Sequence, residues 1–208
     1  MKHLTKGEER MKLGERLKKD FSTITLVLIP VAIVLNIVVG QLVSLLNLPV
    51  FLDSIGTVLV ALLAGPWAGG LTGLLSNLIW GLVSDPVAAA FAPVAMVIGI
   101  VAGLCARWGL FRKWWQALIS GAIISIALSF VAVPIRVYMF GGVTGSGADF
   151  ITAYLLAVGR DLFGSVIITV ITSNLIDKVV TALLAWGIVK ALPRRFIARF
   201  PRSEAVVA

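Results

Sequence analysis

The sequence PVFLDSIGTVLVALLAGPWAGGLTGLLSNLIWGL, residues 49–82, contains two apolar segments that are separated by Gly65-Pro66 and preceded by the acidic, turn-like LDSIG. Pro66 has no backbone N–H and suits the first turn of a new helix. A single spanning helix would tolerate that break poorly. The stretch therefore predicts two short membrane helices joined by a tight bend.

Small residues recur at every fourth position in this stretch, at Ala61, Gly65, Gly69 and Gly73. On a continuous helix they would share one face, and even across the bend Gly69 and Gly73 remain stacked as a small-xxx-small surface. Such surfaces let helix backbones approach closely. Two uses fit this pattern: packing inside the protein, which is the commoner one, and docking against a separate membrane partner.

Composition places the chain in the membrane class. Hydrophobic residues make up 59% of it, charged residues 13%, and the mean hydropathy is +1.03, whereas soluble domains are about a quarter charged. The sole cysteine, Cys105, supports neither a disulfide framework nor a cysteine metal site. We expect an all-α polytopic membrane protein with no metal and no cofactor.

Helix boundaries follow from apolar length and from loop-forming residues. Two stretches are predicted loops: residues 84–93, which contain one Asp-Pro and one Ala-Pro pair, and the glycine-rich GGVTGSGAD, residues 141–149. The predicted spanning helices are 22–46, the two within 49–82, 94–106 (with a start a turn or two earlier left open), 116–140 and 174–192.

Residues 150–173 are apolar, but Gly159-Arg160-Asp161 interrupts them. Burying that charged pair in lipid would be costly. We therefore expect helices that lie at the outer surface and lead into the last spanning helix.

Basic residues test the number of crossings. With six crossings, the amino tail, the loop 107–113 and the tail 190–202 all lie inside, as the positive-inside rule requires. A seventh crossing would place the basic carboxyl tail outside. The predicted organisation is a basic cytoplasmic tail or amphipathic interfacial helix over 1–21, a six-helix membrane domain over 22–192, and a basic cytoplasmic tail over 193–208. Basic residues and tryptophans are interleaved in RWGLFRKWW, residues 107–115. Between two membrane helices this mixture favours a cytoplasmic loop with an interfacial aromatic belt over a nucleic-acid-binding segment.

The stretch FLDSIGTVLVALLAGPWAGGLTGLLSNLIWGL resembles the second and third membrane helices of the substrate-binding (S) subunits of energy-coupling factor (ECF) transporters. In that family a short helix, a Gly-Pro turn and a Gly-rich helix with a polar outer end recur. The resemblance extends from about Leu26 to Arg195. It implies a prokaryotic plasma-membrane protein that takes up a vitamin or a vitamin precursor.

The resemblance also implies partners: a membrane coupling subunit and two cytoplasmic ATPases, with the lipid bilayer around them and no nucleic acid. S subunits dock through an Ala-xxx-Ala surface on the first helix, and the nearest match here is Ala32-xxx-Asn36-xxx-Gly40, which departs from that pattern. The residues predicted to dock a partner are Ala32, Asn36, Gly65, Gly69 and Gly73. The resemblance further implies that ligand binds at the outer face under a loop lid.

Polar and aromatic residues near the outer ends of the helices are the candidate ligand contacts. Aromatic faces with a few placed hydrogen-bonding groups suit a small, mostly planar ligand, and Arg or Lys can meet a carbonyl, carboxylate or phosphate. The predicted substrate-binding residues are Asp53, Asn77, Trp80, Arg136, Tyr138, Arg160, Asn174 and Lys178. Other residues available there are Asp85, Asp161 and Asp177.

Several of these residues have purely structural alternatives. Asp53 suits a helix cap and Asp85 a turn before proline. Arg160 and Asp161 suit pairing with other loop charges, and Asp177 and Lys178 suit pairing with each other.

Motifs for chemistry are absent from the sequence. It has no G-x-x-x-x-G-K-[ST] phosphate loop, no G-x-S-x-G and no H-E-x-x-H, and its sole histidine is His3. We therefore expect a transporter subunit that is not an enzyme. The alternative is a membrane sensory or regulatory domain that acts through a separate signalling partner. A self-sufficient carrier is disfavoured because no internal repeat is visible.

Overall fold

The computed structural model describes residues 13–202, and this part of the chain contains helices and loops but no strand. Within these residues, three helices are long and apolar enough to cross a membrane: α2 (Thr23–Leu45), α7 (Trp114–Phe140) and α9 (Leu162–Ala191). Shorter helices pack among them: α3 (Ile55–Ala64), α4 (Pro66–Val83) and α6 (Ala92–Arg107). The all-α class and the polytopic membrane architecture agree with expectation, and the boundaries of α2 and α7 lie within two residues of those predicted.

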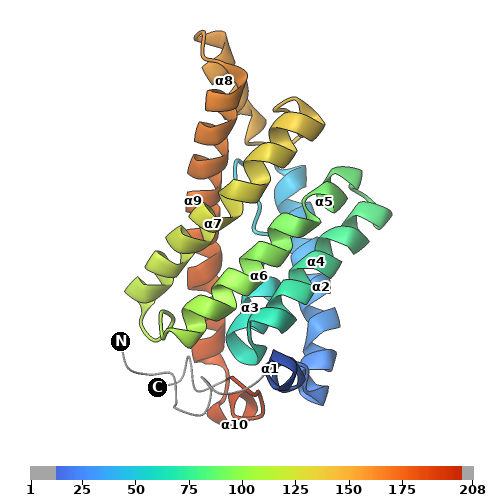
Figure 1. Ribbon diagram of the computed structural model, residues 1–208, viewed down its shortest axis with the longest axis vertical. Helices are drawn as coiled ribbons and strands as arrows, with labels where there is room; N and C mark the ends of the chain where they lie inside the picture. Colours follow the sequence, from blue (N-terminus) through green and yellow to red (C-terminus); the bar gives the residue numbers. More distant parts are fainter. Residues whose placement is uncertain (1–12, 203–208) are drawn as a thin grey trace.

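Short helices mark the two ends of this bundle. The helices α1 (Leu13–Asp20) and α10 (Arg194–Ile197) lie at one end, and α8 (Asp149–Ala157) lies at the other (Figure 1). The predicted interfacial segment 1–21 coincides with α1 only in part, because residues 1–12 lie outside the described residues, as do residues 203–208 of the predicted carboxyl tail.

The bend between α3 and α4 is built as the sequence predicts. Gly65 adopts a φ of +113°, which disfavours residues with a side chain, and Pro66 opens the next helix. A Cβ on Gly69 would collide with Ala61, and one on Gly99 would collide with the backbone of Gly69. The absence of side chains at these glycines therefore allows α3, α4 and α6 to pack backbone to backbone.

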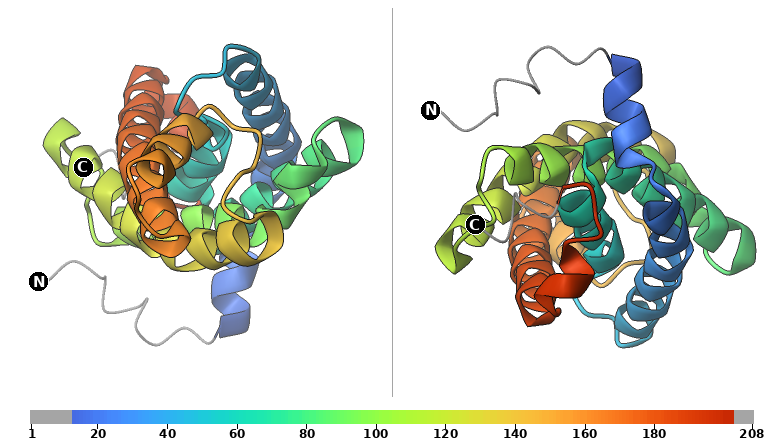
Figure 2. Two further views of the ribbon diagram at one scale, coloured as in Figure 1. Left: turned by 90° about the horizontal axis from the view of Figure 1, so that it is seen from above. Right: turned by 90° about the horizontal axis from the view of Figure 1, so that it is seen from below.

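Helix α3 lies inside the bundle, with α2, α4, α6 and α9 packed around it (Figure 2). It is only 10 residues long and its side chains are almost completely buried, including Val58, Val60 and Leu62. A helix of this length is too short to cross a bilayer by itself, since about 20 residues are needed. Non-helical backbone directly before α3 is tolerated because the N–H groups of Phe51 and Leu52 donate to Asp177 and are satisfied within the protein.

Asn36 joins three helices at the centre of this packing. Its side-chain amide donates to Thr57 Oγ1 (2.8 Å) on α3 and to Ser76 Oγ (2.9 Å) on α4, and its carbonyl accepts from the Gly56 backbone N–H (2.7 Å). The residue is 1% exposed. This amide therefore satisfies its polar groups within the chain, as a polar residue at membrane depth requires.

The five residues predicted to dock a partner are all buried in the chain: Ala32, Asn36, Gly65, Gly69 and Gly73. Four of them lie where α2, α3, α4 and α6 contact one another, and the fifth, Gly65, lies beside the carboxylate of Asp20. This arrangement corresponds to the internal-packing alternative for the glycine ladder. Their role in docking remains a prediction that their burial does not support.

The last helix is longer than predicted. Residues 150–173 do not lie entirely at the surface, because α8 ends at Ala157 and α9 already begins at Leu162. Arg160 and Asp161 lie in the exposed connection between the two helices, and the Asp161 side chain caps α9 by accepting from the Gly164 N–H (2.7 Å). The charged pair thus sits at a helix end, where it does not interrupt the spanning segment.

The predicted loop 84–93 contains a short helix, α5 (Pro86–Ala90). Asp85 caps it by accepting from the Val87 N–H (3.1 Å), and Pro86 occupies its first position. Asp-Pro is thus a helix start here as well as a turn.

Apolar side chains cover the outside of the long helices. On α2 one face is exposed along its whole length, and α7 exposes Ile126 and Phe130 in the same way. The exposed residues of α2 are Leu26, Val27, Val31, Val34, Val38, Leu42 and Leu45. A face of this kind is suited to lipid contact.

Candidate functional site

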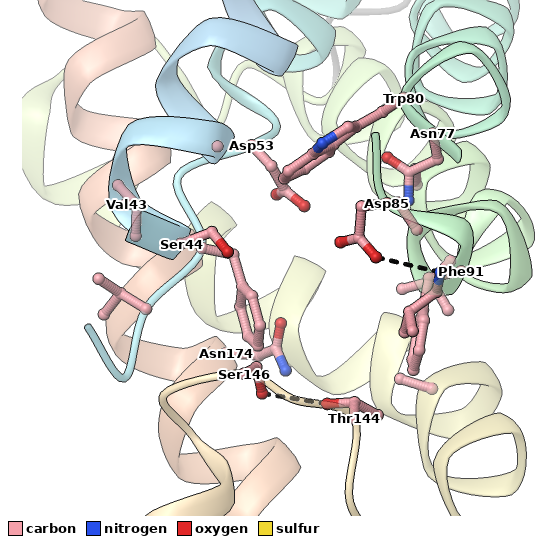
Figure 3. A pocket seen from close by; sticks show the side chains of 18 of the residues that line it. Val43, Ser44, Asp53, Asn77, Trp80, Asp85, Phe91, Thr144, Ser146 and Asn174 are labelled. Atoms are coloured by element: carbon pink, nitrogen blue, oxygen red, sulfur yellow. Dashed lines mark hydrogen bonds between the residues drawn. The ribbon is translucent and has the colours of Figure 1, made fainter. Parts of the chain in front are cut away.

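A cavity lies between the loop that precedes α3, the α4–α5 connection and the loop that joins α7 to α8 (Figure 3). The cavity has a volume of about 140 Å³. Its apolar wall includes Val43, Phe51, Phe91, Ile98 and Val170. An apolar concavity with a few polar groups is the usual form of a small-molecule site.

Six of the eight predicted substrate-binding residues line this cavity: Asp53, Asn77, Trp80, Arg136, Asn174 and Lys178. The other two do not. Tyr138 is 80% exposed on the outside of α7, and Arg160 lies in the exposed α8–α9 connection. The structure therefore brings together residues from four separated parts of the chain, the loop before α3 and the helices α4, α7 and α9, and leaves Tyr138 and Arg160 apart from them.

Lys178 is buried between two carboxylates. Its Nζ lies 2.5 Å from Asp177 Oδ2 and 3.5 Å from Asp53 Oδ1, and it donates to Ser54 Oγ at 2.7 Å. The lysine is 2% exposed. Its charge is therefore compensated within the protein, as a buried ammonium requires.

Asp177 also holds the loop before α3 in place. Its Oδ1 accepts from the backbone N–H groups of Phe51 (3.0 Å) and Leu52 (2.7 Å). Leu52 has a φ of +50°, an uncommon conformation for a residue with a side chain. Because these bonds fix the loop, Phe51 and Asp53 are positioned in the cavity wall.

Arg136 is also compensated from within the chain. It is 3% exposed, its Nη2 pairs with Asp149 Oδ1, and its Nε donates to the Gly142 carbonyl (3.0 Å). The guanidinium therefore ties the end of α7 to the loop that follows it. Direct binding of an anionic ligand group would require this pairing to be exchanged.

The Asp149 carboxylate, which pairs with Arg136, also holds the loop formed by residues 141–148. Asp149 Oδ2 accepts three backbone N–H groups, from Thr144 (2.9 Å), Gly145 (2.6 Å) and Ser146 (3.1 Å). Gly147 packs against the carbonyls of Asn47 and Leu48, where a side chain would collide. The loop thus crosses from α7 toward α2 and covers one side of the cavity.

Trp80, Asn77 and Asn174 form the polar and aromatic part of the wall. Trp80 is 7% exposed, and its Nε1–H donates to Gln41 Oε1 (3.1 Å). Asn174 Nδ2 donates to the Val170 carbonyl (2.9 Å), so its side-chain oxygen is left open to the cavity. Asn77 is 5% exposed and its side chain makes no hydrogen bond within the described residues.

Sequence reasoning missed several residues at this site. It gave no signal for Phe51, which lies in the wall next to the LDSIG turn, or for Gln41, which accepts from Trp80 Nε1–H. The loop 141–149 was predicted from its glycines, and a further signal was Asp149 at its end, a residue type that accepts backbone N–H groups in turns. Among residues 13–202 no group of three or more His, Cys, Asp or Glu side chains is arranged to hold a metal ion.

Comparison with known proteins agrees with this architecture. The family model described as "ECF transporter, substrate-specific component" matches residues 23–189, which is most of the chain. No curated protein and no solved structure gave a significant match. Members of the family are multi-pass membrane transporter subunits without catalytic activity, and they associate with an energising module. The chain belongs to the family of substrate-specific components of energy-coupling factor transporters.

Proposed function

We propose that this protein captures a vitamin or vitamin precursor at the outer face of a prokaryotic plasma membrane and delivers it inward with an ATPase-driven coupling module. The observation that carries the proposal is the cavity under the loop 141–148. Several polar and charged residues that line it are buried, and buried polar residues in a membrane protein usually serve a function. Family membership supplies the transport role.

The distribution of charge supports the orientation. Arg107, Lys113 and Arg195 belong to the end of the bundle that carries α1 and α10, and this end becomes cytoplasmic by the positive-inside rule. The cavity and α8 then face outward. In this arrangement α2, α4, α6, α7 and α9 are five crossings, and α3 together with the non-helical residues that precede it makes the sixth, so that both termini are cytoplasmic.

The wall of the cavity suits a small planar ligand. Phe51, Trp80 and Phe91 offer aromatic surface, and Asn77 and Asn174 offer amide groups. Aromatic side chains bury flat rings well, while amides fix their orientation through hydrogen bonds. Energy for release would come from partners, a membrane coupling subunit and two cytoplasmic ATPases, because the sequence has no phosphate-binding loop of its own.

The test is a thermal-shift and native mass-spectrometry screen of the detergent-purified protein against vitamins and their precursors, without any partner. A bound ligand raises the apparent melting temperature by mass action. We expect one compound to be retained, and Trp80→Ala to abolish its shift. Trp108→Ala is the matched control, because Trp108 follows α6 at the opposite end of the bundle and is 61% exposed.

Absence of any retained compound, or an equal shift in both tryptophan variants, would contradict capture in this cavity. The alternative of a sensory domain would then gain weight, and co-purification with a signalling partner in place of a coupling module would support it.

A further inference from the structure

Charged side chains at the cavity do not balance. Among residues 13–202, four carboxylates lie in or directly behind its wall, but only two cations do. The carboxylates belong to Asp53, Asp85, Asp149 and Asp177, and the cations to Arg136 and Lys178. At neutral pH the site has a formal excess of two negative charges.

The two cations already have partners. Lys178 is shared between Asp53 and Asp177, and Arg136 is paired with Asp149. Both cations are at most 3% exposed. A negatively charged ligand would therefore meet no uncompensated positive group in the wall, and entry would bring it close to excess carboxylate charge in a poorly solvated space.

The excess negative charge is directed at the open space. Asp85 uses one oxygen to cap α5 by accepting from Val87 N–H, and its other oxygen has no partner within the described residues. Asp53 is 22% exposed at its side chain and makes only the 3.5 Å contact with Lys178. Figure 3 shows both carboxylates pointing into the cavity from two different loops.

A second, independent feature marks this space as a ligand site. Asn77 is 5% exposed and lines the cavity, and its side chain has no hydrogen-bond partner within the described residues. Its amide atoms reach the open space of the cavity, where a ligand can supply the hydrogen bonds that the protein does not. Figure 3 shows Asn77 on the same side of the cavity as Asp85, beside the Trp80 side chain.

From this arrangement we infer that the substrate is an organic cation, a planar heterocycle with a fixed or protonated positive charge, held with its charge toward Asp53 and Asp85. The ring lies against the aromatic wall formed by Phe51, Trp80 and Phe91, whose faces also attract cations. Asn77 and the open oxygen of Asn174 bind the polar edge of the ring. This inference rests on the proposed capture function and specifies its substrate class.

The experiment is a thermal-shift and calorimetric comparison of ring systems matched in shape but different in charge. One series is nicotinamide methylated at the ring nitrogen (cation), nicotinamide (neutral) and nicotinate (anion). A second is pyridoxamine, pyridoxine and pyridoxate, and thiamin and pantothenate extend the range of size. We expect cations to stabilise the protein and the anion of each series to leave its melting temperature unchanged.

Asp85→Asn is the decisive variant, because asparagine is also a good helix cap and preserves α5. It should weaken the best cation at least tenfold. Asp161→Asn is the matched control, since Asp161 caps α9 in the same way but does not line the cavity, and it should leave affinity unchanged. If Asp85→Asn does not fold, Asp53→Asn replaces it.

The outcomes separate the two proposals. Tight binding of an anion, or unchanged cation affinity in Asp85→Asn, would overturn the cation inference while leaving substrate capture intact. A wild-type protein that binds no compound of the panel would count against capture itself and against the inference that rests on it.

Discussion

Asp20 and Arg202 lie 182 residues apart in the sequence and form a buried ion pair, in which Arg202 Nε donates to Asp20 Oδ1 at 3.1 Å and Nη2 lies 3.0 Å from the same oxygen. Arg107 contacts the carboxylate from α6 at 3.3 Å. The backbone N–H of Trp67, just after the Gly65-Pro66 bend, donates to it at 3.4 Å.

This carboxylate thus connects α1, the bend, the end of α6 and the carboxyl-terminal segment. Asp20 is fully buried, and burial raises the pKa of its carboxyl above the ordinary value, while Arg202 and Arg107 lower it. Arg202 is also held by its backbone N–H, which donates to the Leu63 carbonyl (3.0 Å). The cluster secures the end of the bundle opposite the cavity.

Asp20→Asn should lower the free energy of unfolding by about 3 kcal/mol, because loss of one partner leaves buried guanidinium charge without its carboxylate. The measurement is the apparent melting temperature in detergent. Glu15→Gln on the same helix is the control and should have no effect, since Glu15 is exposed. Equal melting temperatures for the two variants would show that the cluster contributes little.

Gly99→Ala should destabilise the protein by about 1–3 kcal/mol, the usual cost of overpacking. A Cβ on Gly99 would collide with the backbone of Gly69, which cannot move aside as a side chain can. Gly187→Ala adds the same methyl group to α9, where nothing lies within 4 Å of the new Cβ. That control should be neutral or slightly stabilising, and a comparable loss there would refute the steric explanation.

Asn36→Leu should lower the free energy of unfolding by about 3 kcal/mol, because it removes three hydrogen bonds and leaves the Gly56 N–H without its buried acceptor. Equilibrium unfolding in detergent measures the change. Val34→Leu, on the exposed face of α2, is the control. A stable Asn36→Leu variant would indicate that Thr57 and Ser76 find other partners.

Lys178→Met should be strongly destabilising, because it leaves the buried Asp177 carboxylate and the partly exposed Asp53 carboxylate without their shared cation. Adding Asp177→Asn removes one of those charges, and its amide oxygen can still accept from Phe51 and Leu52. The double variant should therefore be at least as stable as Lys178→Met alone, with a coupling of about 1 kcal/mol or more. Strict additivity in the double-mutant cycle would contradict this account.

Asp149→Asn should loosen the loop 141–148, because one amide oxygen replaces two carboxylate oxygens that serve three backbone N–H groups and Arg136. Limited digestion with proteinase K, followed by mass analysis of the fragments, should show faster cleavage in this loop. Asp161→Asn, which changes a cap outside the loop, should leave that rate unchanged. Equal cleavage rates would show that the loop is held by other contacts.

The sequence by itself determined the membrane class, the all-α fold and most helix ends. Gly65-Pro66 ends one helix and begins the next through backbone conformation alone, and α7 ends at Phe140 because Gly141 follows with a left-handed conformation. Depth in the membrane also singled out Asn77, Trp80 and Asn174, since polar groups there are costly unless they are used. These features depend on residues that are neighbours in the chain.

Only the tertiary structure decided how the charges pair and where α9 begins. Lys178 meets Asp53 across 125 residues, and no local pattern reports such a partner. Residues 162–173 join α9 because Ser165 and Thr169 satisfy their hydroxyls with carbonyls one turn earlier in the same helix, which makes their burial inexpensive. The physical reason is common to both: the cost of burying a polar group depends on its three-dimensional partners, which packing alone brings together.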